Sequence, residues 1–162
     1  MLFRSLILAK QEVIISNFDN LCLKRNKEIE YSMVMDLVLI NPPLTMEERY
    51  GKFAALGSST PNLGLCYLAA SARSKRFNVK IIDAPVQDLD INQTVSLVKE
   101  LNPRFIGVTA PTVSIIRASR LAKAIKDAGI KVPVIIGGAH VSALPKETMN
   151  EFPSFDIGVI NE

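Results

Sequence analysis

Hydrophobic residues occur along this chain in short continuous runs that alternate with longer amphipathic segments. The first clear run, Leu37–Ile40, is followed at once by Asn41-Pro42-Pro43. Continuous apolar runs of this length are typical of parallel strands that are buried on both faces. Four further runs predict strands over residues 79–82, 105–109, 132–136 and 156–160.

Helical spacing fills the intervals between these runs. Asp90 and Gln93 form the pattern of a capping box before apolar positions on one helix face, and Pro103 ends that segment. Three other helices are predicted. The first begins at Pro61 and has Leu65, Leu68, Ala69 and Ala72 on its inward face, and the second runs from a Thr112 cap to Gly129 with Val113, Ile116, Leu121 and Ile125 inward. The third runs from Pro145 to about Glu151.

This alternation of strands and helices predicts the fold class. Strand–helix–strand connections between parallel strands are right-handed and place helices against the sheet. We therefore expect an α/β, flavodoxin-like three-layer sandwich with a five-stranded parallel sheet in the order 2-1-3-4-5. In such a sheet a ligand lies beyond the carboxyl ends of the strands, where the order reverses. The segments at that rim are Asn41-Pro42-Pro43, Thr109-Ala110-Pro111-Thr112 and Gly137-Gly138-Ala139-His140.

Residues 1–32 differ from the rest and include a charged stretch over residues 24–30. Met33 and Met35 lie just before the first convincing strand and are candidate translation starts. We expect an extension of unknown role over residues 1–32 and one domain over residues 33–162.

Composition narrows the functional classes. The chain has 162 residues, of which 48% are hydrophobic and 22% charged, as in an ordinary soluble domain. A net charge of +3 without a basic run is too weak to indicate nucleic acid or a membrane surface as partner. Cys22 and Cys66 lack the spacing of a zinc or redox motif, which favours a reducing cytoplasm.

The residues of the rim allow structural and ligand-binding roles. Gly137-Gly138 suits either a tight turn or the close approach of a ligand to the backbone. Thr109 and Thr112 are hydroxyl donors that also suit strand-end or helix-cap roles. His140, the single histidine, is either a hydrogen-bonded structural residue or a ligand contact.

Two further features bear on the rim. Asp83 ends the second strand and is expected to cap it, since the glycine-rich turn of a dinucleotide site is missing after the first strand. The connection from Pro42 to Thr60 is long for a strand-to-helix loop and is either disordered or a lid or docking surface. No nucleophile–base, metal-ligand or triphosphate motif is present, so the sequence indicates a binding protein with no catalytic or metal-ligating residues.

Three segments read Pro61-Asn-Leu-Gly-Leu-Cys-Tyr-Leu-Ala-Ala70, Ile106-Gly-Val-Thr-Ala110 and Ile136-Gly-Gly-Ala-His-Val-Ser-Ala-Leu-Pro145. Together they resemble the N-terminal cobalamin-binding domain of cobalamin-dependent radical-SAM enzymes. That group includes methyltransferases and the anaerobic magnesium-protoporphyrin monomethyl ester cyclase. The resemblance covers about residues 36–162, and the order and spacing of the segments make it specific.

The resemblance implies a role for the rim. In cobalamin-binding domains a Ser-x-Leu segment and a Gly-Gly pair line the cleft for the nucleotide tail of the cofactor. Thr109-Ala110-Pro111 takes the first place, with Pro instead of Leu, and Gly137-Gly138 takes the second. The cofactor-binding residues implied are Asn41, Pro43, Thr109, Ala110, Thr112, Gly137, Gly138 and His140. A side chain in the Gly138→Val variant is expected to fill the cleft and abolish binding.

Two departures from cobalamin-domain patterns limit what the chain is expected to do. The Asp-x-His-x-x-Gly loop that supplies an imidazole to cobalt is replaced by Asn41-Pro42-Pro43, as in the radical-SAM group. The chain also lacks CxxxCxxC, so it is not expected to be an enzyme by itself. The resemblance implies a radical-SAM domain as partner, in the same parent chain or separate, which would bring an iron–sulfur cluster and S-adenosylmethionine.

Two rival hypotheses remain beside a cobalamin-binding module. The first is an α/β nucleotide-binding or receiver-like regulatory module, although the sequence lacks a phosphate-binding glycine turn and the paired acidic residues of a receiver. The second is a domain that keeps the fold and binds no ligand.

Overall fold

The computed structural model describes residues 6–9, 35–56 and 60–161. These residues form a six-stranded sheet in the order β1-β6-β5-β4-β2-β3. The strands are β1 (Leu6–Ala9), β2 (Leu37–Asn41), β3 (Val79–Asp83), β4 (Phe105–Thr109), β5 (Val134–Gly137) and β6 (Ile157–Ile160).

The parallel part of the sheet confirms the predicted topology. β2 pairs in parallel with β3 and with β4, β4 pairs with β5, and β5 pairs with β6. Counted along the chain from β2, these five strands have the order 2-1-3-4-5. β5 begins at Val134, two residues later than expected, because the preceding Pro133 has no backbone N–H to donate to a neighbouring strand.

β1 is an addition that the sequence did not predict. It pairs antiparallel with β6, from Leu6 opposite Ile160 to Ala9 opposite Ile157. Four residues of the segment 1–32 therefore extend the sheet. The remainder of that segment, and the candidate start Met33, lie outside the described residues.

The helices match the predicted order, with additions. They are α2 (Met46–Tyr50), α3 (Leu63–Ser74), α4 (Ile91–Leu101), α5 (Ile115–Asp127), α6 (Ala139–Ala143) and α7 (Pro145–Glu151), with 3-10 helices η1 (Gly51–Leu56) and η2 (Thr112–Ser114). The capping box before α4 is confirmed, since Asp90 accepts from the Gln93 N–H and Gln93 accepts from the Asp90 N–H. α2 and η1 lie within the long connection after β2, which the sequence did not predict to be helical.

The start of α5 differs from the prediction. Thr112 does not cap the helix, because η2 intervenes and the residue before α5 is Ser114. Val113 lies in this 3-10 turn, and Ile116 is five residues before Leu121 and so off the buried face of α5, which leaves both side chains exposed instead of buried. Ile115 faces the core in their place, whereas Leu121 and Ile125 are buried as expected.

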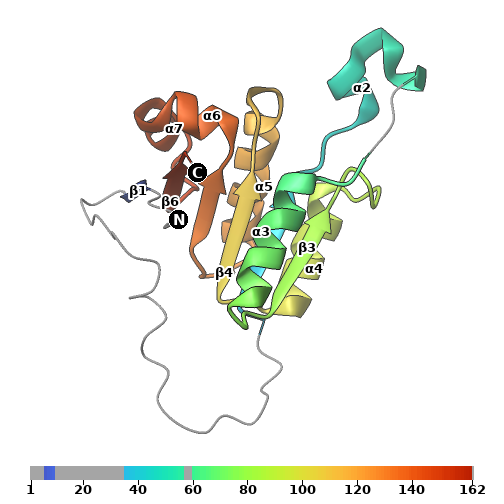
Figure 1. Ribbon diagram of the computed structural model, residues 1–162. Coiled ribbons are helices and arrows are strands. Elements are labelled where there is room, and N and C mark those ends of the chain that lie inside the picture. The colour runs from blue at the N-terminus through green and yellow to red at the C-terminus, as the bar shows by residue number, and fades with distance from the viewer. Residues whose placement is uncertain (1–5, 10–34, 57–59, 162) are drawn as a thin grey trace, which may run out of the picture.

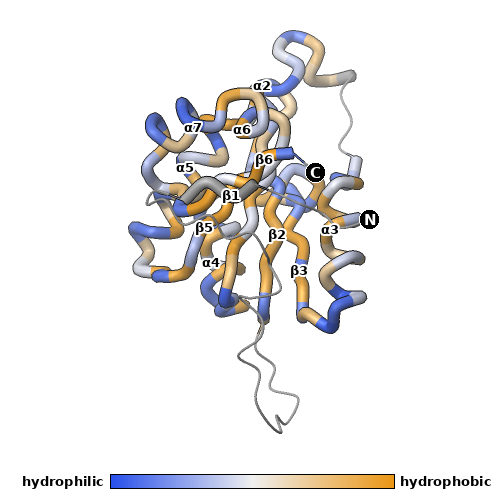
Figure 2. The backbone as a smooth tube through the Cα atoms, turned by 60° about the vertical axis from the view of Figure 1, so that its left-hand side comes forward, coloured by the Kyte–Doolittle hydropathy of each residue, from blue (hydrophilic) through white to orange (hydrophobic). Residues whose placement is uncertain are grey.

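Two groups of buried side chains fix the layers. The larger group joins one face of the sheet to α4, α5, α6 and α7, and includes Ile106, Val134 and Phe155. The smaller group lies on the other face, where Leu65 and Ala69 of α3 pack on β2 and β3. Figure 1 shows α3 on one side of the sheet and α4 and α5 on the other. Figure 2 shows the strands as the most hydrophobic part of the tube.

Among the described residues, a helix covers the α3 face of the sheet over β2 and β3 only. Four half-buried side chains of β4, β5 and β6 belong to neither core group and form what we call the open face: Phe105, Ile135, Ile157 and Val159. Handedness explains this asymmetry, because only the β2–α3–β3 crossover runs toward the β3 edge, and the other crossovers run the opposite way. Leu68, predicted to face inward, is exposed because no other described helix lies beside α3 on this face.

Candidate ligand-binding rim

The carboxyl ends of β4 and β5 meet in one compact backbone arrangement. Thr109 and Gly137 are direct partners in the sheet, and the Ala110 N–H donates to the Gly137 carbonyl at 3.0 Å. The His140 N–H donates to the Ala110 carbonyl at 3.3 Å. The structure therefore brings together two of the predicted rim segments, those that follow β4 and β5. They lie at the upper edge of the sheet in Figure 1.

The two glycines of this rim have different environments. Gly138 has φ +107°, and a Cβ there would lie 3.0 Å from the Ala110 carbonyl oxygen and 3.2 Å from Thr109 Oγ1. Gly138 is therefore required for the close approach of two backbone segments, and the Gly138→Val variant would displace the backbone. This corrects the expectation that such a side chain would simply fill a cleft. A Cβ at Gly137 would meet no atom within 4 Å, so this position faces open space.

The polar side chains of the rim form a second contact between its segments. Thr112 Oγ1 and His140 Nδ1 are 3.2 Å apart. Thr112 is exposed and His140 is half-buried, so the pair borders solvent. The structure thus gives Thr112 a contact across the rim in place of the predicted helix cap, and it gives His140 a hydrogen-bonded position within the predicted site.

The end of β2 belongs to a neighbouring polar cluster. Asn41 donates its amide to Asp83 Oδ1 at 2.8 Å, and the Asn62 N–H donates to Asp83 Oδ2 at 2.8 Å. Asp83 is buried and joins the ends of β2 and β3 to the start of α3, which confirms its predicted strand-end role. Pro43 is buried, so its side chain does not border the rim surface in this structure.

Sequence reasoning missed the apolar side chains at this end of the molecule. Large exposed hydrophobic residues follow the carboxyl ends of several strands: Tyr50, Phe53, Leu63, Val86, Val113, Ile116 and Leu144. Single exposed hydrophobic residues are normal, whereas a concentration of them marks a surface for a ligand or partner. Val113 and Ile116 were predicted to face inward, although Ile116 is five residues before Leu121 and therefore does not share its helix face.

The long connection after β2 contacts α5 through an ion pair. Glu48 of α2 forms an ion pair with Arg117, the third residue of α5.

Among the described residues, no group of three or more His, Cys, Asp or Glu is arranged to hold a metal ion. No helix in the described part of the chain is long and apolar enough to cross a membrane.

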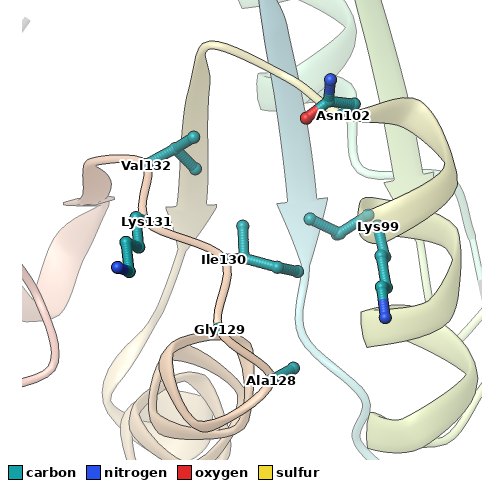
Figure 3. A pocket seen from close by; sticks show the side chains of 8 residues that line it. Lys99, Asn102, Ala128, Gly129, Ile130, Lys131 and Val132 are labelled. Atoms are coloured by element: carbon teal, nitrogen blue, oxygen red, sulfur yellow. The ribbon is translucent and has the colours of Figure 1, made fainter.

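A pocket of about 240 Å³ lies at the opposite end of the sheet, away from all predicted site residues. It is lined by the end of α4, with Lys99 and Asn102, and by the segment 128–132 that connects α5 to β5 (Figure 3). Its lining is mainly aliphatic and backbone, with Lys99 and Lys131 exposed. It contains no group of residues that points to chemistry.

Comparisons with known proteins found a family model and relatives that match this chain. The family model described as B12 binding domain matches residues 52–162. An uncharacterized methyltransferase of Pyrococcus horikoshii is 35% identical over 129 residues, which are 80% of this chain and 27% of that protein. The anaerobic magnesium-protoporphyrin IX monomethyl ester cyclase of Rubrivivax gelatinosus is 26% identical over 110 residues, which are 67% of this chain and 20% of that protein. The chain thus spans only a minor part of the length of either relative.

Proposed function

Because this chain belongs to the B12-binding domain family, we propose that its rim holds cobalamin across the carboxyl ends of β2, β4 and β5. The observation that carries the proposal is the contiguous surface formed by Thr109, Gly137, Gly138 and His140. In this role the chain positions the cofactor, and the reactivity belongs to the cobalt centre.

The residues present suit this ligand. Cobalamin is a broad macrocycle with neutral amides around its edge and a nucleotide tail that contains one phosphate. A ligand of this kind requires backbone space together with hydroxyl and amide partners. Gly137 leaves the backbone open on the α3 side of the sheet, where Thr109 also lies. We infer that the nucleotide tail runs over Thr109 and Gly137 and that Thr112 and His140 border the macrocycle.

The cofactor is proposed to bind without an imidazole from the connection after β2. That connection contains no histidine, and His140 is the single histidine of the chain. His140 follows β5 and has a partner in Thr112. Because the nucleotide tail is proposed to lie over Thr109 and Gly137, away from the cobalt, the spectrum expected for bound hydroxocobalamin is that of the form in which the nucleotide base has left the cobalt.

We infer further that the domain serves a larger enzyme that contains a radical-SAM domain. The two relatives are named as a methyltransferase and a cyclase, and this chain matches only 27% and 20% of their lengths. Methyl transfer or ring formation on a substrate would then be performed jointly with that second domain. The test is the surrounding reading frame, in which a CxxxCxxC motif is expected and its absence would contradict this assignment.

Binding of cobalamin is tested by titrating the purified protein with hydroxocobalamin and recording the visible spectrum. The wild-type protein is expected to shift the spectrum with saturation at micromolar concentrations. The Gly137→Val variant is expected to bind at least about tenfold more weakly, because the added side chain occupies the open space above β5.

Two controls make this titration specific. Ala128→Val adds the same kind of bulk at an exposed position at the opposite end of the sheet and should bind as the wild type does. ATP and GTP should give no thermal stabilisation, whereas a nucleotide-binding module would be stabilised by them. A cobalamin spectrum that is unchanged by wild-type protein would contradict the proposed function.

A further inference from the structure

The connection after β2 forms a separate arm, which we define as residues 45–56. It comprises the N-cap Thr45, α2 and η1, and none of the residues of α2 is buried. Figure 1 shows the arm standing off the upper end of the domain, beyond the carboxyl ends of the strands. A segment with so little buried surface needs a specific contact to keep one orientation.

Glu48 provides such a contact because its carboxylate has two roles. Oε2 accepts hydrogen bonds from the Thr45 N–H at 3.1 Å and from Thr45 Oγ1 at 3.2 Å, which completes the capping box of α2. Oε1 forms the ion pair with Arg117. The same side chain therefore fixes the start of the arm and joins the arm to α5.

Arg117 has a position that is otherwise unfavourable. It lies in the first turn of α5, where the helix dipole disfavours a positive charge. Its side chain is 30% exposed and that of Glu48 is 32% exposed, so this pair is less solvated than the pair of Lys123 and Asp127 on the same helix, whose side chains are 68% and 63% exposed. A charge that is unfavourable for its own helix and paired with the arm indicates a role in holding the arm.

The ion pair joins two segments that carry exposed hydrophobic side chains. On the arm, Phe53 is 70% exposed and Tyr50 is 37% exposed. On η2 and α5, Val113 is 58% exposed and Ile116 is 48% exposed. Val113 directly follows Thr112, whose hydroxyl contacts His140, so η2 carries an exposed apolar side chain next to a polar residue of the rim.

We propose that Glu48 and Arg117 are a positioning pair that holds these four side chains as an apolar wall against the corrin macrocycle. The inference rests on the proposed function, since the occupant of the wall is the cofactor itself. A macrocycle with apolar faces and amides at its edge needs apolar and hydrogen-bonding surfaces side by side, which the arm and the rim supply together.

The first experiment is a double-mutant cycle with Glu48→Gln and Arg117→Gln, read out as the dissociation constant for hydroxocobalamin. Glu48→Gln removes the negative charge and keeps the helix cap, because glutamine can also complete a capping box. Each single variant is expected to bind about three- to fivefold more weakly, and the double variant no more weakly than either single one. Asp127→Asn, which removes the exposed ion pair of the same helix, is the matched control and should bind as the wild type does.

A second measurement follows the arm directly. Trypsin cleaves after Arg49 and Lys52, both of which are exposed on the arm. Cleavage there is expected to be faster in Glu48→Gln than in wild type, and added hydroxocobalamin should slow it in wild type. Phe53→Ala should also weaken binding, whereas Leu68→Ala, at an exposed position of α3, should not.

The outcomes separate the two proposals. If the wild-type protein leaves the cobalamin spectrum unchanged, the proposed function and the apolar wall both fail. If wild type binds while Glu48→Gln, Arg117→Gln and Phe53→Ala bind as Asp127→Asn does, cobalamin binding stands and the positioning role is overturned. Additive losses in the double variant would likewise show that the two residues do not act as a pair.

Discussion

At the scale of single residues, two neighbouring glycines at the end of β5 have different physical roles. Gly138 combines a positive φ with atoms of Ala110 at the closest distance that a Cβ tolerates. Gly137 has neither constraint. The sequence shows only the pair, because the backbone angle and the approach of β4 depend on tertiary contacts. It identified the location of the candidate site and could not tell which glycine serves the fold.

These environments predict opposite effects on stability. Gly138→Ala is expected to lower the free energy of unfolding by about 1–3 kcal/mol, since alanine is strained at positive φ and crowds Ala110. Gly137→Ala is expected to be neutral or slightly stabilising, because it reduces the freedom of the unfolded chain without a clash. Urea denaturation of both variants measures the difference, and equal midpoints would show that the close approach is not needed.

Asp83 provides a second prediction at this scale. In Asp83→Asn an amide NH₂ replaces one of the two oxygens that accept from Asn41 and Asn62. The hydrogen bonds in this buried site then lose the negative charge that strengthens them, and we expect a loss of about 1–3 kcal/mol in the free energy of unfolding. The exposed Asp88 lies in the turn after β3, so Asp88→Asn is the matched control and should unfold at the wild-type urea concentration.

At the scale of elements, the sequence predicted helices best where local side chains fix the ends. Asp90 and Gln93 fixed the start of α4, and Pro145 fixed the start of α7. The start of α5 was predicted wrongly because Ser114 ends a 3-10 turn and makes no side-chain cap with the helix. Strands β2, β3 and β4 were predicted nearly to the residue, since they are apolar runs interrupted by polar residues or proline.

The capping box of α4 gives a prediction for a whole element. Asp90→Ala removes the acceptor for the Gln93 N–H at 2.7 Å, and the helix loses its side-chain cap. We expect the protein to be less stable by about 1 kcal/mol, measured as a lower thermal midpoint. Asn92→Ala changes an exposed residue within the first turn of the same helix and should leave the midpoint within error of the wild type.

At the scale of the whole molecule, topology explains both what was predicted and what was not. Alternating strands and helices determined the order of the five parallel strands through the handedness of their connections. The same rule places α4, α5, α6 and α7 on one face and leaves the open face over β4, β5 and β6. β1 could not be foreseen, because four apolar residues near an end of the chain carry no signal for the strand they join.

The division of the chain at residue 32 is a proposal that truncation can test. A protein that begins at Met33 keeps all five parallel strands and every rim residue, so it should fold and bind hydroxocobalamin with the affinity of the full chain. Circular dichroism and the spectral titration measure this, and loss of binding would show that residues 1–32 belong to the functional domain.

The antiparallel pairing of β1 with β6 has a practical consequence for that shortened protein. With β1 in place, the N–H and C=O groups along the outer side of β6 are matched from Ile157 to Ile160. Without it they become a free template for another polypeptide, beside a sheet surface that already exposes apolar atoms. The shorter protein should therefore aggregate as its concentration is raised, which light scattering measures, whereas the full chain should remain monodisperse. In that case β1 protects the edge of β6 from aggregation.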